Sequence, residues 1–250
     1  MNTSSKTLVW DLPTRIFHWL LVIVVFMQFA SGIVAGEWLT IHSYLGYLTL
    51  TLIFFRLFWG ICGGHWSRFK NFVPTPFSLL NYVRGLFNIS SLVNTPHEKL
   101  PFNPQQLATP NSSVLSASPS HNPLGAVSIL LMLLLLLLQV LSGSMSSDDI
   151  AFAGPLVNAV GNDTVEWMTW YHSCVGYYLL ICLITLHVFA ILFYQIKKSN
   201  NLTLAMISGY KKLEAPVRAS SDTKAKRLLA LFLLAVSASF VYILVMYFSN

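Results

Sequence analysis

Five long apolar runs constrain the fold of this chain more than any other feature. Each run reaches the roughly 20 residues that a helix needs to cross a hydrocarbon core about 30 Å thick. Only 10% of the residues are charged, whereas about 25% are charged in a soluble domain. We therefore predict an all-α membrane protein, because a helix pairs its own backbone groups where water is absent. The expected helices span about 16–36, 39–62, 124–143, 168–195 and 228–248.

The charges indicate how these helices cross the membrane. The net charge is +6, and we attribute it to membrane orientation rather than to a nucleic-acid partner, because Lys and Arg collect in cytoplasmic loops. We expect a cytoplasmic N-terminus and a C-terminus outside, which five spans satisfy. The first run could be a cleaved signal peptide, but its length favours a retained helix. The segments predicted outside carry no Lys or Arg and hold Glu37, Asp148, Asp149, Asp163 and Glu166.

An internal repeat relates the first two helices to the next two. Gln28 to Gly32 and Gln139 to Gly143 share the pattern Gln-x-x-Ser-Gly. His42 to Tyr47 and His172 to Tyr177 share His-Ser-x-x-Gly-Tyr. Two hairpins that run in the same direction indicate a parallel repeat about an axis along the membrane normal. The repeat therefore predicts that His42 and His172 face each other at one depth.

Four histidines lie within or at the edges of the predicted spans, where ionisable side chains are costly and are functional candidates. His42 and His172 form an outer layer, whereas His18 and His187 form an inner one. His187 follows His172 by 15 residues, or about 22 Å along a helix. Two imidazoles at one depth match the axial ligands of a b-type haem. We predict two non-covalent haems b, one between His42 and His172 and one between His18 and His187.

Two arginines are candidates to bind the propionates of the inner haem. Arg56 lies inside the second span, 14 residues beyond His42 and hence about 21 Å deeper. A bidentate contact to a carboxylate would suit its guanidinium, and Arg15 is a second candidate. Snorkelling of Arg56 to the inner headgroups is the alternative. The chain has no Cys-x-x-Cys-His motif, which excludes covalent c-type haem attachment within it.

The chain divides into two parts. Residues 1–212 are expected to form the di-haem domain, a four-helix bundle of two hairpins, with a flexible cytoplasmic loop rich in Pro and Ser over 97–121. Residues 213–250 form a basic linker and a fifth, C-terminal transmembrane helix.

Several motifs resemble those of the bacterial cytochrome b561 and Ni,Fe-hydrogenase b-type cytochrome superfamily. The resemblance covers roughly residues 8–212, and its most specific part is Trp-Asp-x-Pro-x-Arg-x-x-His-Trp over 10–19. Further matches are Arg-Leu-Phe-Trp-Gly from Arg56, His-Asn-Pro-Leu-Gly-Ala from His121 and Leu-His-Val from Leu186. The resemblance implies a di-haem cytochrome of the bacterial inner membrane that moves electrons between the quinone pool and a redox partner. It implies the same four histidines as haem ligands.

The leading functional hypothesis is therefore electron transfer between quinone or quinol and a partner such as a periplasmic c-type cytochrome. The chain would act as an electron-transfer protein or as a component of a quinone-linked oxidoreductase. The acidic outer segment could steer a basic partner, although the charge bias of membrane loops explains it as well. A second hypothesis is an anchoring subunit of a dehydrogenase or hydrogenase. A third is a haem-free transporter or metal carrier whose histidines bind Zn or Cu.

Overall fold

The computed structural model describes residues 5–92, 122–150, 152–197, 201–213 and 217–249. The predicted loop over 97–121 lies outside these residues.

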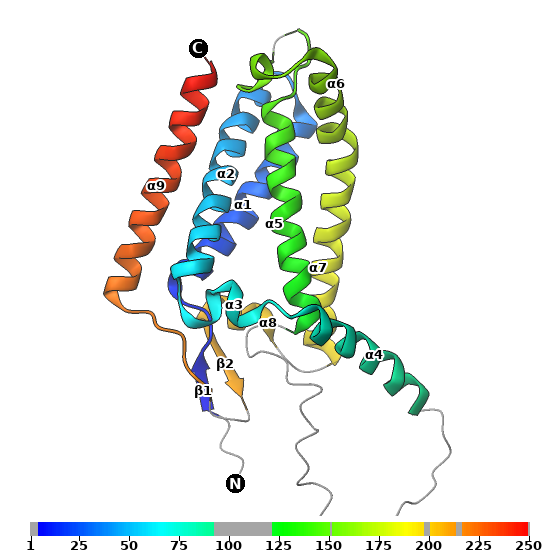
Figure 1. Ribbon diagram of the computed structural model, residues 1–250, viewed down its shortest axis with the longest axis vertical. Coiled ribbons are helices and arrows are strands. Elements are labelled where there is room, and N and C mark those ends of the chain that lie inside the picture. The colour runs from blue at the N-terminus through cyan, green and yellow to red at the C-terminus, as the bar shows by residue number, and fades with distance from the viewer. Residues whose placement is uncertain (1–4, 93–121, 151, 198–200, 214–216, 250) are drawn as a thin grey trace, which may run out of the picture.

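Five long helical stretches dominate the structure and confirm the predicted helical transmembrane bundle (Figure 1). Each is long and apolar enough to cross a membrane. They are α1 (Leu12–Val34), α2 (Trp38–Cys62), α5 (Pro123–Ser144), the continuous stretch Asn162–Lys197 and α9 (Lys224–Ser249). The fourth stretch consists of α6 (Asn162–Trp170), a π-helical segment η5 (Tyr171–Gly176) and α7 (Tyr177–Lys197).

Capping residues start two of the spans earlier than the apolar runs predict. Asp11 precedes α1 and accepts a hydrogen bond from the backbone N–H of Thr14 at 2.9 Å. Pro13 fits the first turn of that helix, where its missing N–H would have no intrahelical partner. Asn122 caps α5 in the same way through the N–H of Gly125.

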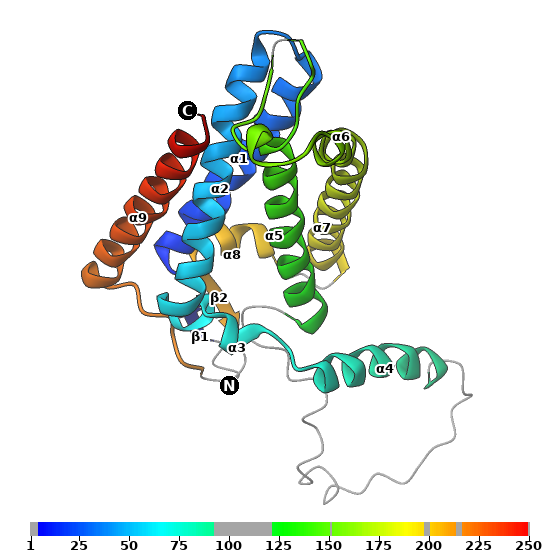
Figure 2. The same cartoon turned by 45° about the horizontal axis from the view of Figure 1, so that its top comes forward.

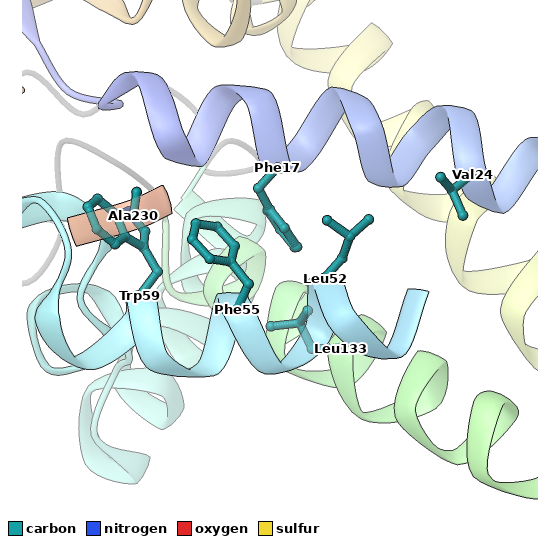
Figure 3. Packing of buried hydrophobic residues seen from close by; sticks show 7 residues of the cluster. All are labelled: Phe17, Val24, Leu52, Phe55, Trp59, Leu133 and Ala230. Carbon is teal, nitrogen blue, oxygen red and sulfur yellow. The ribbon is translucent and has the colours of Figure 1, made fainter. Parts of the chain in front are cut away.

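Helix α2 lies at the centre of the bundle and contacts α1, α5 and α9. The helices pair as two hairpins, α1 with α2 and α5 with α7, as the repeat predicts. Figure 3 shows the core cluster that joins them. Its members come from α1, α2, α5 and α9: Phe17, Val24, Leu52, Phe55, Trp59, Leu133 and Ala230.

A small sheet closes one end of the bundle. Strand β1 (Ser5–Leu8) pairs antiparallel with β2 (Tyr210–Leu213), so that Lys6 lies opposite Lys212. The N–H of Val9 continues the pairing with a bond of 2.9 Å to the carbonyl of Gly209. This sheet is not among the elements predicted from the sequence. It joins the start of α1 to the segment after α7, and the C-terminal end of α9 lies at the opposite end of the bundle (Figure 1).

In the described part of the connections, the chain forms four short helices and one helix of 17 residues. The short ones are η1 (His65–Ser67), α3 (Phe69–Phe72), η4 (Val157–Ala159) and α8 (Leu202–Ser208). The longer one is α4 (Pro76–Leu92), which extends away from the bundle and across its long axis (Figures 1 and 2).

Candidate cofactor site

The two histidines of the predicted outer layer meet in the structure. The ring centroids of His42 and His172 are 5.9 Å apart, and the ring planes are at 89°. His42 lies in the second turn of α2, and His172 lies in the π-helical segment η5. Single π-helical turns occur often at functional sites. The internal repeat thus brings together two residues that are far apart in the sequence.

Each of these rings is held by the helix that precedes it in its own hairpin. His42 Nδ1 lies 3.0 Å from the carbonyl oxygen of Gln28 and 3.2 Å from the hydroxyl of Ser31. In the second hairpin, His172 Nδ1 lies 2.8 Å from the carbonyl of Gln139 and 3.4 Å from the Ser142 hydroxyl. The Gln-x-x-Ser-Gly repeat is therefore the support of the two histidines.

These contacts fix the protonation of both rings. A carbonyl oxygen only accepts hydrogen bonds, so Nδ1 must carry the proton that is donated to it. In the neutral imidazole the lone pair then lies on Nε2, which is the nitrogen available to a metal. Such a contact from the second ring nitrogen is the usual support of a metal-binding histidine.

Glycines leave the space into which the histidines pack. A Cβ atom at Gly143 would lie 2.7 Å from His172 Cε1, and one at Gly32 would lie 3.3 Å from His42 Cε1. Gly176 in η5 faces the side chain of Gln139. The glycines of the repeat therefore have a steric role, since a larger residue would displace a ring or its support.

A mostly apolar cavity of about 450 Å³ surrounds the outer pair. Its size is within the range of cofactor and ligand sites. Both histidines and both glutamines line it, together with residues of α1, α2, α5, η5 and α9. Two oriented imidazoles in an apolar cavity fit a b-type haem, which needs one axial donor on each face and an apolar environment.

The predicted inner pair has different surroundings. His18 of α1 and His187 of α7 are partly buried, and they are close enough for their charges to interact. Among the described residues, His18 Nδ1 is buried and has no hydrogen-bond partner. The same holds for Trp19 Nε1 and Arg15 Nε on the same helix. Three unpaired polar atoms close to His18 fit a site for a group that carries polar substituents. Haem is such a group, because it carries propionates.

Arg56 takes part in a polar cluster at this end of the bundle. Only 5% of it is exposed, and its Nη1 donates a hydrogen bond of 3.1 Å to the carbonyl of Ser67. Its guanidinium carbon lies 4.8 Å from the ring centroid of Phe69, within reach of a cation–π interaction. Arg15 Nη1 donates to the carbonyl of Ile207 at 2.5 Å. The binding of a propionate by either arginine stays a prediction.

The residue at the centre of this cluster is Asp11, which is not among the site residues predicted from the sequence. It is 0% exposed and accepts hydrogen bonds from the Thr14 hydroxyl at 2.7 Å, the Ser67 hydroxyl at 2.6 Å and Trp59 Nε1 at 3.1 Å. A buried carboxylate requires such partners. Asp11 therefore fixes the start of α1 against α2, two turns before His18.

Two of the remaining histidines, His97 and His121, lie outside the described residues. His65 lies in η1, where partial burial, together with the nearby cations Arg218, Arg68 and Lys70, lowers its pKa. Its imidazole is therefore neutral at pH 7 and has no second histidine ring beside it among the described aromatic contacts. His65 thus differs from the four paired histidines.

Comparison with known proteins identifies the family. The family model of the prokaryotic cytochrome b561 matches residues 9–209, which include both hairpins and all four paired histidines. No curated protein and no solved structure gives a significant match. The chain therefore belongs to the prokaryotic cytochrome b561 family, a family of helical transmembrane bundles that transfer electrons across a membrane by means of b-type haem.

Proposed function

We propose that this cytochrome binds two haems b, one between His42 and His172 and one between His18 and His187. The observation that carries the proposal is the outer pair, whose rings lie 5.9 Å apart and are each supported at Nδ1 by a glutamine carbonyl. The inner pair is supported by the electrostatic interaction between His18 and His187 and by three buried polar atoms of α1 that have no partner among the described residues. Bound haem supplies the one-electron redox chemistry, since its iron alternates between the ferric and ferrous states.

The residues of this chain have three tasks in that function. The carbonyls of Gln28 and Gln139 keep the tautomer and the orientation of the outer imidazoles. The apolar residues around the cavity keep water away from the metal site. The Asp11 cluster holds the start of α1, and with it His18, in a fixed position relative to α2.

We propose further that the cytochrome connects the quinone pool with a periplasmic c-type cytochrome or another oxidoreductase subunit. In the orientation that we propose, the sheet of β1 and β2 lies in the cytoplasm and the C-terminus lies in the periplasm of a bacterial inner membrane. The basic residues support it, because Lys and Arg collect in cytoplasmic loops. The acidic residues Asp149, Asp163 and Glu166 are exposed on the opposite side. Their charge would attract a basic partner.

The alternative of a haem-free metal carrier has less support. In the part of the chain that the structure describes, no group of three or more His, Cys, Asp or Glu residues could hold a metal ion. A structural zinc site normally needs four protein ligands and a catalytic one needs three. Pairs of histidines therefore favour haem.

The decisive experiment is the reduced-minus-oxidised absorption spectrum of the purified protein with a pyridine haemochrome count. We expect two b-type haems per chain. A folded preparation without haem would overturn the proposal and support the metal carrier.

The proposed partner is tested by the rate of electron transfer to cytochrome c. We expect this rate to fall with added salt and in the variant Asp163→Asn/Glu166→Gln. A rate that is independent of both would exclude charge steering by this surface.

A further inference from the structure

Helix α9 lies outside the part of the chain that the family model matches, which ends at residue 209. It nevertheless packs along α2, the central helix of the bundle, as both views of the ribbon show (Figures 1 and 2). Three groups of contacts, one near each end of α9 and one at its middle, hold it there.

At the start of α9, a lysine binds the end of α2. Lys226 Nζ donates a hydrogen bond of 2.5 Å to the carbonyl of Cys62, the last residue of α2. The last carbonyls of a helix have no intrahelical partner and carry partial negative charge, so an ammonium group stabilises them. One turn later, Ala230 is buried against the core cluster with Trp59 (Figure 3).

The middle of α9 packs with aromatic and small residues. Ser237 is fully buried, and its hydroxyl donates to the carbonyl of Leu233 within the helix, so it leaves no polar atom unpaired. The rings of Phe240 and Phe54 meet edge to face, with centroids 5.0 Å apart at 81°. Such aromatic pairs contribute beyond the area that they bury.

The outer end of α9 reaches the outer histidine pair. Val241 is buried with Leu50 of α2 and Val140 of α5. The next turn contributes Leu244 and Val245 to the lining of the cavity that holds His42 and His172. One helix outside the family match therefore supplies part of the surface of the outer site.

We infer that α9 is a structural wall of the outer haem site, which closes the side of the cavity beyond the four-helix core. This inference rests on the proposed haem at His42 and His172. His42 is four residues after the start of α2 at Trp38, or about 6 Å along the helix. At that depth the alternative to a protein wall is the headgroup region with its water. Solvent access and burial control haem retention and reduction potential.

The test removes the wall without removing the helix. The variant Leu244→Ala/Val245→Ala truncates the two side chains that face the cavity. The matched control Ile243→Ala/Tyr247→Ala truncates two neighbours that are 65% and 76% exposed. Haem transfer to excess apomyoglobin and a spectroscopic redox titration are measured for both variants. We expect the outer haem of the cavity variant to leave roughly tenfold faster, a factor that corresponds to about 1.4 kcal/mol of lost packing.

We also expect its midpoint potential to fall, because access of water stabilises the more highly charged ferric form, while the inner haem and the control keep wild-type values. Equal behaviour of the cavity variant and the control would overturn the inference and leave the proposed function intact. A wild-type protein without haem at His42 and His172 would overturn both.

A second measurement tests the position of α9 without reference to haem. Cys62, Cys174 and Cys182 are replaced by Ser, and a short bifunctional thiol reagent is added to Phe54→Cys/Phe240→Cys in membranes. We expect efficient cross-linking within one chain and little in the control Phe54→Cys/Tyr242→Cys, because Tyr242 is 66% exposed and lies about 200° around the helix from Phe240. Equal cross-linking of the two pairs would contradict the packing of α9 on α2 and overturn the inference.

Discussion

The outer and inner histidine pairs are held by different means. At the outer pair each ring has two polar neighbours at Nδ1, and a glycine lies against each imidazole. At the inner pair, His18 Nδ1 is buried without a partner among the described residues. The nearby cluster around Asp11 holds the helix backbone rather than the ring. The outer site is therefore ordered by direct contacts to the imidazole rings. The inner site is ordered by contacts that hold the start of α1.

This difference has a physical origin in the repeat. The Gln-x-x-Ser-Gly pattern occurs only where α1 and α5 pass the outer histidines, so the two halves of the outer site are built alike. The inner histidines come from α1 and α7 and have no such pattern around them. We therefore expect substitutions at the outer site to affect the ligands directly, and substitutions near the inner site to act through the position of α1.

The largest effect should come from Gly143→Ala. The new Cβ atom would lie 2.7 Å from His172 Cε1, closer than real contacts allow, so the ring must move from its support. We expect most of the outer haem to be lost in a haemochrome count. Gly32→Ala, with a contact of 3.3 Å to His42, should retain more of it. Gly161→Ala, where a Cβ meets nothing within 4 Å, is the control. Full haem content in Gly143→Ala would contradict the tight packing of the outer site.

The next effect should come from Asp11→Ala at the other end of the bundle. This change removes the cap of α1 and takes the carboxylate acceptor from the buried donors of Thr14, Trp59 and Ser67, which keep only the hydrogen bonds among themselves. We expect a loss of about 3 kcal/mol in the free energy of unfolding, measured in detergent or bicelles, and preferential loss of the inner haem. Loss of the outer haem first would show that the Asp11 cluster does not act on the inner site.

The charges of Arg56 and Arg15 should affect the inner haem and not the outer one. A cation near a haem disfavours the ferric form, so Arg56→Gln and Arg15→Gln should each lower the midpoint potential of the inner haem. For one electron, 59 mV corresponds to about 1.4 kcal/mol, and we expect shifts of about this size. The outer haem should keep its potential. If Arg56→Gln changes neither the potential nor the retention of the inner haem, Arg56 does not bind a propionate. Its role would then be limited to its contacts with Ser67 and Phe69.

The smallest effect should come from the serines of the repeat. Ser31→Ala and Ser142→Ala remove the second neighbour of each Nδ1 but leave the glutamine carbonyl in place. We expect the outer midpoint potential to rise by roughly 30 mV in each case, because a weaker hydrogen bond makes the imidazole a poorer donor to ferric iron. A shift of the inner haem instead would contradict the assignment of these serines to the outer site.

Much of the fold could be predicted from the sequence because apolar length alone defines a membrane span. The five expected helices agree with the structure to within a few residues at most ends. The largest difference is the start of the fourth stretch, at Asn162 instead of 168, since the polar helix α6 continues into η5 without a break. The cap by Asp11 and the proline after it carried a signal for the earlier start of α1.

The features that were missed depend on contacts between distant segments. Strands β1 and β2 have four residues each and pair over a separation of about 200 positions, so neither has a pattern of its own. The π-helical turn around His172 has no sequence signature. The Gln-x-x-Ser-Gly repeat carried a signal for the residues that support the outer histidines. That the acceptor at Nδ1 is the backbone carbonyl of the glutamine is visible only in three dimensions.

The haem content of variants that lack one histidine assigns the ligands of each haem. His18→Ala, His42→Ala, His172→Ala and His187→Ala are purified with the control His65→Ala, and haem is counted and titrated in each. We expect His42→Ala and His172→Ala to lose one and the same haem, His18→Ala and His187→Ala to lose the other, and His65→Ala to keep both. Loss of different haems by His42→Ala and His172→Ala, or full haem content in either, would contradict the binding of one haem between His42 and His172.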